Sequence, residues 1–488
     1  MCNHDHSNTR LREIANSLVL LLLGMTLWTL SSIASANTAS SCGSDVTVNQ
    51  CPANGAGAEE STPDPASSNT TRQAPAGVGN PINLITGNKY QKHTDYQSPS
   101  SRLSWQRHYN SSNSAYDFGM GRGWAATFLA SLQFRNRQGA ALVQGNGRRI
   151  NFREPLTVTD PDGNEHLLWQ AYAPSDGTLH IEGDYTLWSL PDGRQLKFKD
   201  QFLVSIDFPG PAFLKLFYVN KRIDNVTDEY GRQLTFDYYP NHVTLPTYIE
   251  PGDETDATAQ ANTFGQAPAR LQRLTLPNGQ AIEYDYDPRG NLTRVRYPDS
   301  TDRIYHYENA FYPSHLTGLT DRRGQRLATW SYNDEGYAIL SEHADGVERI
   351  DLTYNHPTFI GGIGTTNVTN SLGEQSTYTW QRHPDTGHGL ILAAEGAGCA
   401  TCPPTDTNYT YNDQFQLTDA TRDDGSGLRW EYDAQGRTIA SYRIGNDGSE
   451  RLIKEQIYEI PDATQPSTYS ARPKVVRYPS VNSAGGQP

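Results

Sequence analysis

The sequence repeats a short pattern, in which an aromatic residue, any residue and a second aromatic residue are usually followed by Asp, Asn or Glu. The weaker copies end at Phe198, Tyr218 and Tyr238, each 20 residues from the next. Sequence periods in this range are typical of proteins built by stacking one supersecondary unit on the next. The strong copies are 21 to 31 residues apart and end at Tyr286, Tyr307, Tyr332, Tyr354, Trp380, Tyr411 and Tyr432.

Each repeat predicts a β-hairpin. The run 282–286 alternates apolar and polar residues, which is the pattern of a half-buried strand. The residues Asp287 to Asn291 then form a turn signal, since Asp opens a turn through its side chain and Gly290 supplies a positive φ. A second alternating run over 292–297 completes the hairpin. We therefore expect an all-β chain of antiparallel hairpins.

Tyrosine is the most abundant aromatic residue, with 28 Tyr against 14 Phe and 8 Trp. A sheet that is wet on one side can bury a tyrosine ring and keep its hydroxyl hydrated, which is the role we expect for the repeat tyrosines. Trp330, Trp380 and Trp430 occupy the paired aromatic positions. We expect these three rings to pack within the sheet rather than to stack on the rings of a carbohydrate ligand.

Several motifs resemble the Rhs/YD-repeat family. Residues 286–292 (YDPRGNL) and 432–437 (YDAQGR) are similar to its YD repeat. Upstream, residues 79–90 (GNPINLITGNKY), 94–96, 107–112 and 119–124 (GMGRGW) resemble the N-terminal module that precedes the repeats. The resemblance extends from Gly79 to Asp462.

That resemblance implies a long antiparallel β-ribbon of repeats, about 20 to 25 residues each, that coils into a hollow shell. In the family, such shells commonly enclose a variable C-terminal toxin used in competition between bacteria. Related shells occur in insecticidal toxin complexes, and YD repeats also occur in animal adhesion proteins. No catalytic residues are assigned to the repeats. Residues 450–488 contain no counterpart of the family's cleavage region or toxin, so we expect the N-terminal part of a shell, either truncated or without cargo.

The first 36 residues predict a secretory signal. Arg10 and Arg12 precede an apolar run from Leu18 to Leu30, and Ala34-Ser35-Ala36 fits a cleavage site after Ala36. A retained N-terminal anchor is the alternative. We expect a secreted or cell-envelope protein with no membrane span after cleavage. Nucleic acid is not an expected partner, because 40 Lys and Arg stand against 54 Asp and Glu, a net charge of −14.

The sequence therefore predicts five segments. They are the signal (1–36), a disordered lead (37–78), an N-terminal Rhs-associated β module (79–155), the Rhs/YD-repeat shell (156–462) and a tail (463–488) that is a possible truncated repeat. Two irregular stretches interrupt the shell, namely a polar loop insert at 240–272 and a patch at 385–406 that contains a C-x-x-C motif.

The exported chain keeps four cysteines, Cys42, Cys51, Cys399 and Cys402. An even number in an oxidising compartment favours structural disulfides. A redox motif would be followed by a helical pattern, which is lacking after Cys402, and a zinc site would need further ligands, for which His383 and His388 are the nearest candidates. The zinc and redox alternatives stay open.

No catalytic, cofactor-binding or metal-binding residues stand out. The stretch 160–164 (DPDGN) lacks the spacing of a calcium loop and predicts a turn instead. The favoured function is structural, with a C-terminal toxin cargo or further shell repeats as partners. The first alternative is an envelope carbohydrate-binding or adhesion protein whose partners are surface glycans. The second is a hydrolase with a site near 385–406, for which His388 is the candidate.

Overall fold

The computed structural model describes residues 77–134, 139–159, 163, 165–240, 269–359, 361–383, 389–396, 406–434, 436–458 and 473–479. These residues form 34 strands and three short 3-10 turns, without an α-helix among them. The strands are antiparallel throughout the long sheet, which contains 29 of them. The predicted all-β class is therefore confirmed.

The first strands form two small sheets. β1 pairs with β2, and β3, β4 and β5 make a three-stranded sheet that we call the inner sheet. The bounds are β1 Gly77–Val78, β2 Ile82–Asn83, β3 Tyr90–Gln97, β4 Ser104–Asn110, η1 Ser111–Asn113 and β5 Trp124–Ala126.

The remaining strands belong to the long sheet. Its first half consists of β6 Ser131–Phe134, β7 Ala140–Val143, β8 Arg149–Phe152, β9 Leu156–Thr159, β10 Glu165–Gln170, β11 Thr178–Glu182, β12 Tyr185–Ser189, β13 Gln195–Lys199, β14 Phe202–Asp207, β15 Phe213–Val219, β16 Arg222–Asp228 and β17 Gln233–Tyr238, with η2 Pro174–Asp176 between β10 and β11.

The second half continues in chain order after residue 268. It consists of β18 Leu271–Thr275, β19 Ala281–Tyr286, β20 Leu292–Arg296, β21 Asp302–His306, β22 Gly318–Thr320, β23 Arg326–Tyr332, β24 Ala338–His343, η3 Ala344–Gly346, β25 Ile350–Asn355, β26 Ile363–Asn370, β27 Gln375–Arg382, β28 Gly389–Gly396, β29 Thr407–Tyr411, β30 Leu417–Arg422, β31 Gly427–Tyr432, β32 Thr438–Ile444, β33 Glu450–Ile457 and β34 Val475–Arg477.

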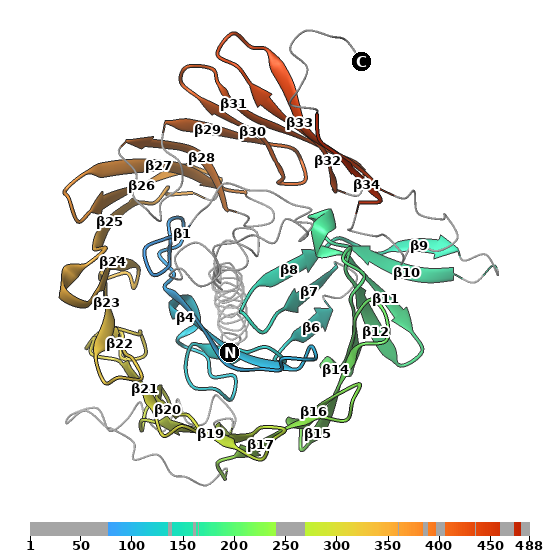
Figure 1. Ribbon diagram of the computed structural model, residues 1–488, viewed down its shortest axis with the longest axis vertical. Helices are drawn as coiled ribbons and strands as arrows, with labels where there is room; N and C mark the ends of the chain where they lie inside the picture. The colour runs from blue at the N-terminus through green and yellow to red at the C-terminus, as the bar shows by residue number, and fades with distance from the viewer. Residues whose placement is uncertain are drawn as a thin grey trace, which may run out of the picture. The chain divides into compact units, whose positions relative to one another are not determined.

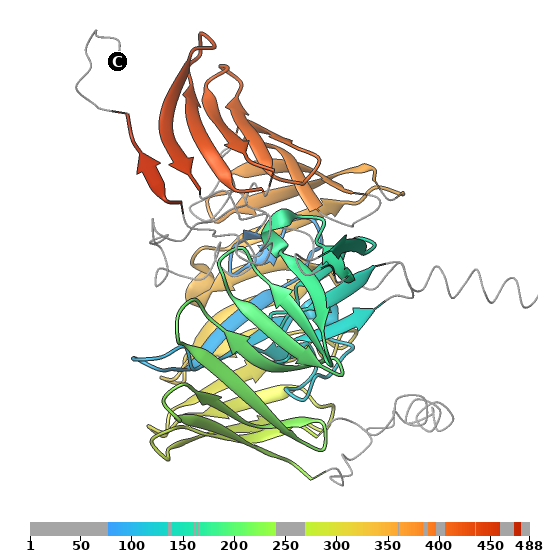
Figure 2. The ribbon, with the colours of Figure 1, turned by 90° about the vertical axis from the view of Figure 1, so that its right-hand side faces the viewer.

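From β9 to β34, each strand pairs with the next one along the chain. The strands β6 to β8 join the same sheet, because Ser131 in β6 pairs with Phe202 in β14, and Phe152 in β8 forms a bridge with Ala171 after β10. Figure 1 shows the green and yellow strands curving around the blue inner strands, and Figure 2 shows successive green hairpins side by side with the blue strands behind them. The sheet is thus a wound succession of hairpins.

Ladders within a hairpin are longer than those between hairpins along much of this sheet. β15 and β16 share six residue pairs, whereas β14 and β15 share three. β23 and β24 share five pairs against two for β24 and β25, and β27 and β28 share seven against two for β28 and β29. Consecutive hairpins therefore diverge at one end, as the accumulating twist of a long sheet requires.

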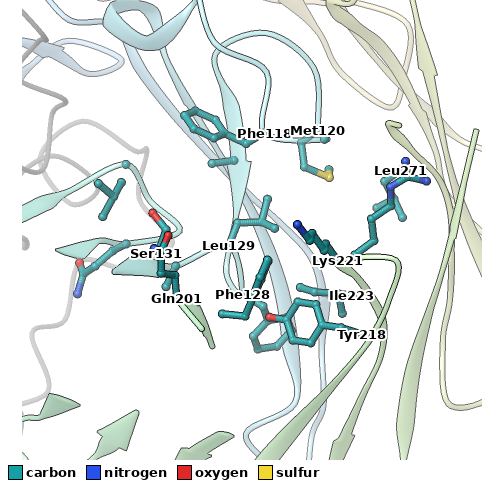
Figure 3. A pocket seen from close by; sticks show the side chains of 18 of the residues that line it. Phe118, Met120, Phe128, Leu129, Ser131, Gln201, Tyr218, Lys221, Ile223 and Leu271 are labelled. Carbon is teal, nitrogen blue, oxygen red and sulfur yellow. The ribbon is translucent and has the colours of Figure 1, made fainter. Parts of the chain in front are cut away.

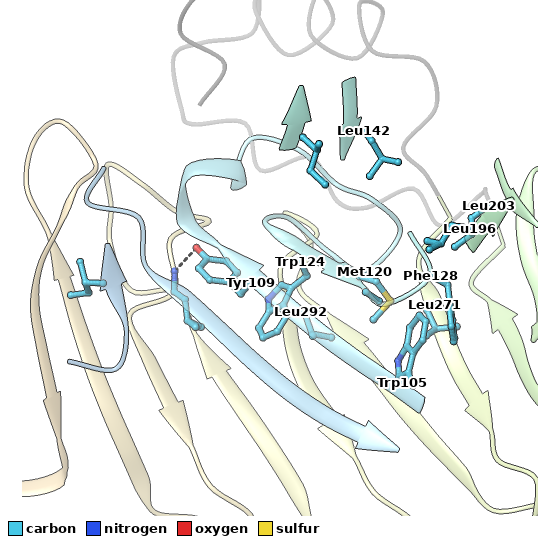
Figure 4. Close-up of a cluster of buried hydrophobic side chains, with 14 of the residues drawn as sticks. Trp105, Tyr109, Met120, Trp124, Phe128, Leu142, Leu196, Leu203, Leu271 and Leu292 are labelled. Carbon is cyan, nitrogen blue, oxygen red and sulfur yellow. Dashed lines mark hydrogen bonds between the residues drawn. The ribbon is translucent and has the colours of Figure 1, made fainter. Parts of the chain in front are cut away.

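The core lies between the inner sheet and the concave side of the long sheet. Trp105 and Trp124 of the inner sheet are buried, as are Tyr284, Trp330 and Trp380 of the long sheet. Figure 4 shows Trp105, Tyr109 and Trp124 among Met120, Phe128, Leu271 and Leu292, so that side chains from both sheets fill one layer. Burying such rings is the main favourable term for holding the two sheets together.

Two glycines of the N-terminal motifs permit this close packing. Gly87 has φ +64°, and a Cβ there would lie 2.5 Å from the Cβ of Tyr337. Gly121 has φ +92°, and a Cβ there would lie 2.9 Å from the backbone nitrogen of Leu292. A larger residue would suffer both from the backbone conformation and from the contact. The motifs that carry the family resemblance therefore lie where the chain touches the repeats.

Several predicted features fall outside the described residues. These are the signal (1–36), almost all of the lead (37–76), the four cysteines Cys42, Cys51, Cys399 and Cys402, His388, most of the stretch 160–164, most of the insert (241–268), most of the 385–406 patch and most of the tail. The part of the chain that the structure describes has no helix with the length and apolar character of a membrane span.

Candidate functional site

The repeat tyrosines bind the backbone of the preceding hairpin. Tyr286 Oη donates to the carbonyl of Leu271 at 2.8 Å, and Tyr307 Oη donates to that of Leu292 at 3.0 Å. We call such a bond a tyrosine bracket. The other brackets join Tyr218 to Leu203, Tyr238 to Ile223, Tyr332 to Leu316, Tyr354 to Ala338, Tyr411 to Ile391 and Tyr432 to Leu417, at 2.6 to 2.9 Å.

The short ladders between hairpins explain the brackets. β20 and β21 pair only from Arg294↔Ile304 to Arg296↔Asp302, so the ladder stops short of the Leu292 carbonyl. An unpaired buried carbonyl is costly. Tyr307, the residue just after β21, extends its hydroxyl across the gap and satisfies this acceptor. Each bracket therefore closes the divergent end of two neighbouring hairpins.

The tyrosine hydroxyls were expected to be hydrated, whereas in the structure they donate to backbone carbonyls. Burial raises the pKa of Tyr286 and Tyr307 well above the usual range, so both hydroxyls remain donors. The expectation failed because it considered one face of one strand, whereas the acceptor belongs to the neighbouring hairpin. Trp380 is the exception among the strong repeat copies, since its Nε1 donates to Thr366 Oγ1 at 3.0 Å in the paired strand.

In several copies the residue after the repeat tyrosine fixes a turn. Asp287 Oδ1 accepts from the backbone N–H of Asn291 at 2.8 Å, and its Oδ2 accepts from the Asn291 side chain at 2.8 Å. Asp433 holds Arg437 in the same way, through backbone N–H and guanidinium. Gly290 and Gly436 supply the positive φ within these turns. The tyrosine joins hairpins, and the aspartate shapes the turn that follows.

The three tryptophans of the repeats are not exposed. Trp330 is 1% exposed, Trp380 is 0% exposed and Trp430 is 6% exposed. A sugar ring needs a free aromatic face for stacking. These rings instead serve the core, and Trp330 Nε1 donates to the carbonyl of Asn80 at 3.1 Å. The structure therefore provides no stacking platform at these three positions.

A buried polar cluster joins the inner sheet to the repeats, and we call it the Asp95 cluster. Arg107 lies bidentate on Asp95, with Nε at 2.5 Å from Oδ2 and Nη2 at 2.9 Å from Oδ1. Tyr284 Oη donates to Oδ2 at 3.0 Å, and Tyr297 Oη donates to Oδ1 at 2.8 Å. Arg107 Nη2 also donates to Tyr305 Oη at 3.0 Å. Both charged side chains are 0% exposed.

The electrostatics of the Asp95 cluster keep Arg107 protonated. Burial by itself would lower the pKa of Arg107, but the charge of Asp95 holds that pKa well above its usual value. Burial raises the pKa of Tyr284 and Tyr297, and the Asp95 carboxylate raises both further. A bidentate pair with two added hydroxyl donors satisfies the carboxylate oxygens, which is the condition for tolerating a buried charge.

Two histidines of the inner sheet lie beside this cluster. Burial is the largest cause lowering the pKa of His93, followed by the charges of Arg303 and Arg107. Burial, with Lys92 and Arg107, lowers the pKa of His108 to about 3. His108 Nδ1 lies 2.6 Å from Tyr90 Oη. Both rings are therefore neutral near neutral pH.

Both charged residues of this cluster lie in sequence motifs that were noted above only for their family resemblance. Asp95 lies in the 94–96 motif and Arg107 begins the 107–112 motif, but nothing in either motif predicts that the two meet beneath Tyr284 and Tyr297. The described residues contain no group of three His, Cys, Asp or Glu placed to hold a metal ion. The cluster connects two sheets, and its geometry suits that role.

Comparisons with known proteins match two segments of the chain. Residues 79–152 match the model of a domain of unknown function, DUF6531, and residues 270–302 match the RHS Repeat model. The first segment contains the inner sheet with Asp95 and Arg107, and the second contains the hairpin with Tyr286. The search of curated proteins found no match.

Solved structures with similarity to the chain include two described as TcdB2-TccC3, one of them without its hypervariable C-terminal region. Each is 9% identical to this chain and has a TM-score of 0.30. The matches cover 79% and 77% of this chain, and 22% and 23% of the other chains. This chain therefore spans less than a quarter of the length of those proteins.

Proposed function

We propose, from the premise that this chain is a Rhs/YD-repeat protein, that it is an exported structural protein forming the N-terminal part of the wall of a toxin-enclosing shell. The observation that carries the proposal is the continuity of the long sheet. From β9 to β34 every strand pairs with the next, and eight tyrosine brackets among the described repeats join successive hairpins.

The inner sheet supports the same role. It lies on the concave side of the long sheet, with Trp124 Nε1 donating to Tyr307 Oη at 2.9 Å. The segment after β2 adds a contact with β26, in which Thr366 Oγ1 donates to the Leu84 carbonyl at 2.5 Å. Such contacts would anchor the beginning of the wall. Further repeats and a C-terminal toxin are the partners that the proposal requires. Interbacterial competition or cell contact is the proposed setting.

The downstream gene sequence tests the proposal. We expect the reading frame or an adjacent gene to encode more YD repeats, a distinct C-terminal domain and a small immunity protein. Production of that C-terminal domain alone should inhibit bacterial growth, and co-production of the immunity protein should restore it. A gene neighbourhood without repeats or a growth-inhibiting domain would refute the toxin-shell role.

Export is tested separately. We expect the protein isolated from the producing cells to begin at Asn37, because Ala34-Ser35-Ala36 fits a signal-peptidase site. Mass spectrometry of the N-terminal peptide from the envelope and secreted fractions measures this directly. Replacement of Ala36 by a bulky residue, Ala36→Trp, should block processing. A chain that keeps Met1 in the cytoplasm would refute export and leave the shell role to its own test.

A further inference from the structure

A cavity lies between the N-terminal module and the hairpins β13 to β16. Its volume is about 340 Å³. This is within the range of pockets that bind small molecules, which is roughly 300 to 1,000 Å³. Its walls are largely apolar and include Met120, Phe128, Leu129 and Ile223. The cavity therefore suits the apolar part of a small ligand.

The charge of the cavity is opposite to that of the protein. The chain carries a net charge of −14, with 54 Asp and Glu. Yet among the 22 described residues that line the cavity, two are cationic, Lys221 and Arg222, and none is Asp or Glu. Arg222 lies against the ring of Tyr238, with its guanidinium 5.7 Å from the ring centre. Lys221 is exposed, so its ammonium is accessible to a ligand.

Two adjacent hairpin turns place the polar lining. Asp200 and Gln201 connect β13 to β14 with φ of 48° and 74°, and Asn220 and Lys221 connect β15 to β16 with φ of 52° and 63°. Two successive residues with positive φ form the tight hairpin turn that matches sheet twist. The second residue of each turn, Gln201 or Lys221, lines the cavity. Figure 3 shows Lys221 among Leu129, Ile223 and Tyr218, with Gln201 beside Ser131.

We infer that this cavity binds a single-chain anionic amphiphile, such as a medium-chain fatty acid. The apolar chain of the ligand packs against Met120, Phe128, Leu129 and Ile223, and its anionic head pairs with Lys221. Burial of the chain supplies most of the affinity, because apolar surface is stabilised when it leaves water. The charge-assisted hydrogen bond to Lys221 selects the head group.

Isothermal titration calorimetry of the mature full chain with decanoate, below its micelle concentration, tests this inference. We expect saturable binding of one decanoate per chain, weaker binding of decanol and no binding of decyltrimethylammonium. Lys221→Met should weaken decanoate binding about tenfold, the effect of losing one charge-assisted hydrogen bond, and should leave decanol binding unchanged. Ser131→Trp should abolish binding of both by filling the cavity.

Lys215→Met is the matched control. Lys215 lies on the same hairpin, exposed, with Nζ 4.9 Å from the ring centre of Phe213, and it does not line the cavity. Its replacement should leave decanoate affinity unchanged. Thermal unfolding verifies that each variant is folded. Absence of decanoate binding, equal binding of the cationic amphiphile, or equal loss in the Lys221 and Lys215 variants would overturn the inference.

Discussion

Each tyrosine bracket combines an apolar and a polar contribution in one side chain. The ring of Tyr286 packs against the core cluster, and its hydroxyl satisfies the Leu271 carbonyl that the ladder between β18 and β19 does not reach. Phenylalanine would keep the first contribution and lose the second. This difference accounts for the preference of the repeats for tyrosine over phenylalanine at this position.

Tyr286→Phe should therefore weaken its hairpin junction by about 1 to 3 kcal/mol, the cost of a buried acceptor without its donor. A long repeat array need not unfold in one step, so a local measurement is required. Hydrogen exchange of the amides in β18 and β19 should show a matching fall in the free energy of opening. Tyr116→Phe is the control, because Tyr116 is 45% exposed. Equal exchange in the two variants would contradict the bracket role.

At this scale the sequence predicted the turn residues better than the tyrosine contacts. Asp287 and Gly290 act within five residues of one another, so their spacing in the chain suffices to predict the turn. The acceptor for Tyr286 lies 15 residues upstream in another hairpin. Whether that carbonyl lacks a partner in the ladder depends on where two neighbouring hairpins diverge, and no local sequence pattern predicts this point.

At the scale of elements, the inner sheet must find one position on a repetitive surface. Neighbouring repeats present similar inward aromatic residues, Tyr284, Tyr305 and Trp330, and a shift by one repeat would preserve much of the apolar contact. It would also separate the Asp95 and Arg107 pair from Tyr284, Tyr297 and Tyr305. A buried charge without its hydrogen bonds is costly, so the Asp95 cluster selects one register.

Asp95→Asn should destabilise the docked inner sheet by about 3 to 5 kcal/mol, because Arg107 would keep a buried charge without a counterion. The double variant Asp95→Asn, Arg107→Met should recover part of this loss. Thermal unfolding and protease susceptibility of residues 79–126 measure the effect. A double variant no more stable than the single one would contradict the account.

Asp192→Asn is the matched control for that change. Asp192 pairs with Arg194 at 2.6 Å, but the two side chains are 43% and 45% exposed. Exposed pairs contribute about 0 to 1 kcal/mol, so this substitution should have little effect. Similar losses at positions 95 and 192 would show that burial of the Asp95 cluster is unimportant.

At the scale of the whole molecule, the buried histidines couple stability to pH. The folded-state pKa of His108 is about 3, lowered first by burial and then by Lys92 and Arg107. In the unfolded chain a histidine titrates near 6.5. Below that pH the unfolded state binds a proton that the folded state does not, so stability falls as the pH decreases.

Stability should therefore be greatest above about pH 6.5 and should fall between there and about pH 3, by up to about 1.4 kcal/mol per pH unit for each such histidine. His108→Gln, which can still bond to Tyr90, should reduce the slope by one proton. Urea unfolding at pH 7, 6 and 5 measures the slope. His166→Gln at an exposed position is the control, and an unchanged slope in His108→Gln would refute the coupling.

The fold class could be predicted from the sequence because hairpins repeat a local pattern, and 282–297 shows it completely. The position of the inner sheet and the cavity could not. Both depend on residues that are far apart in the chain, such as Trp105 and Tyr284, or Met120 and Lys221. The 94–96 and 107–112 motifs indicated the family of the N-terminal module but not its docking site.

The unequal ladders have a mechanical consequence. The sheet has stiff units, the hairpins, and several of the junctions between them are narrow. The junctions β20–β21, β24–β25 and β28–β29 each contain two or three ladder pairs and one tyrosine hydroxyl. Tension applied across the sheet would pass through all of its junctions in series, and the narrow junctions would open before the hairpins themselves. The sheet would then open one hairpin at a time, in steps that match the repeat spacing of 20 to 31 residues.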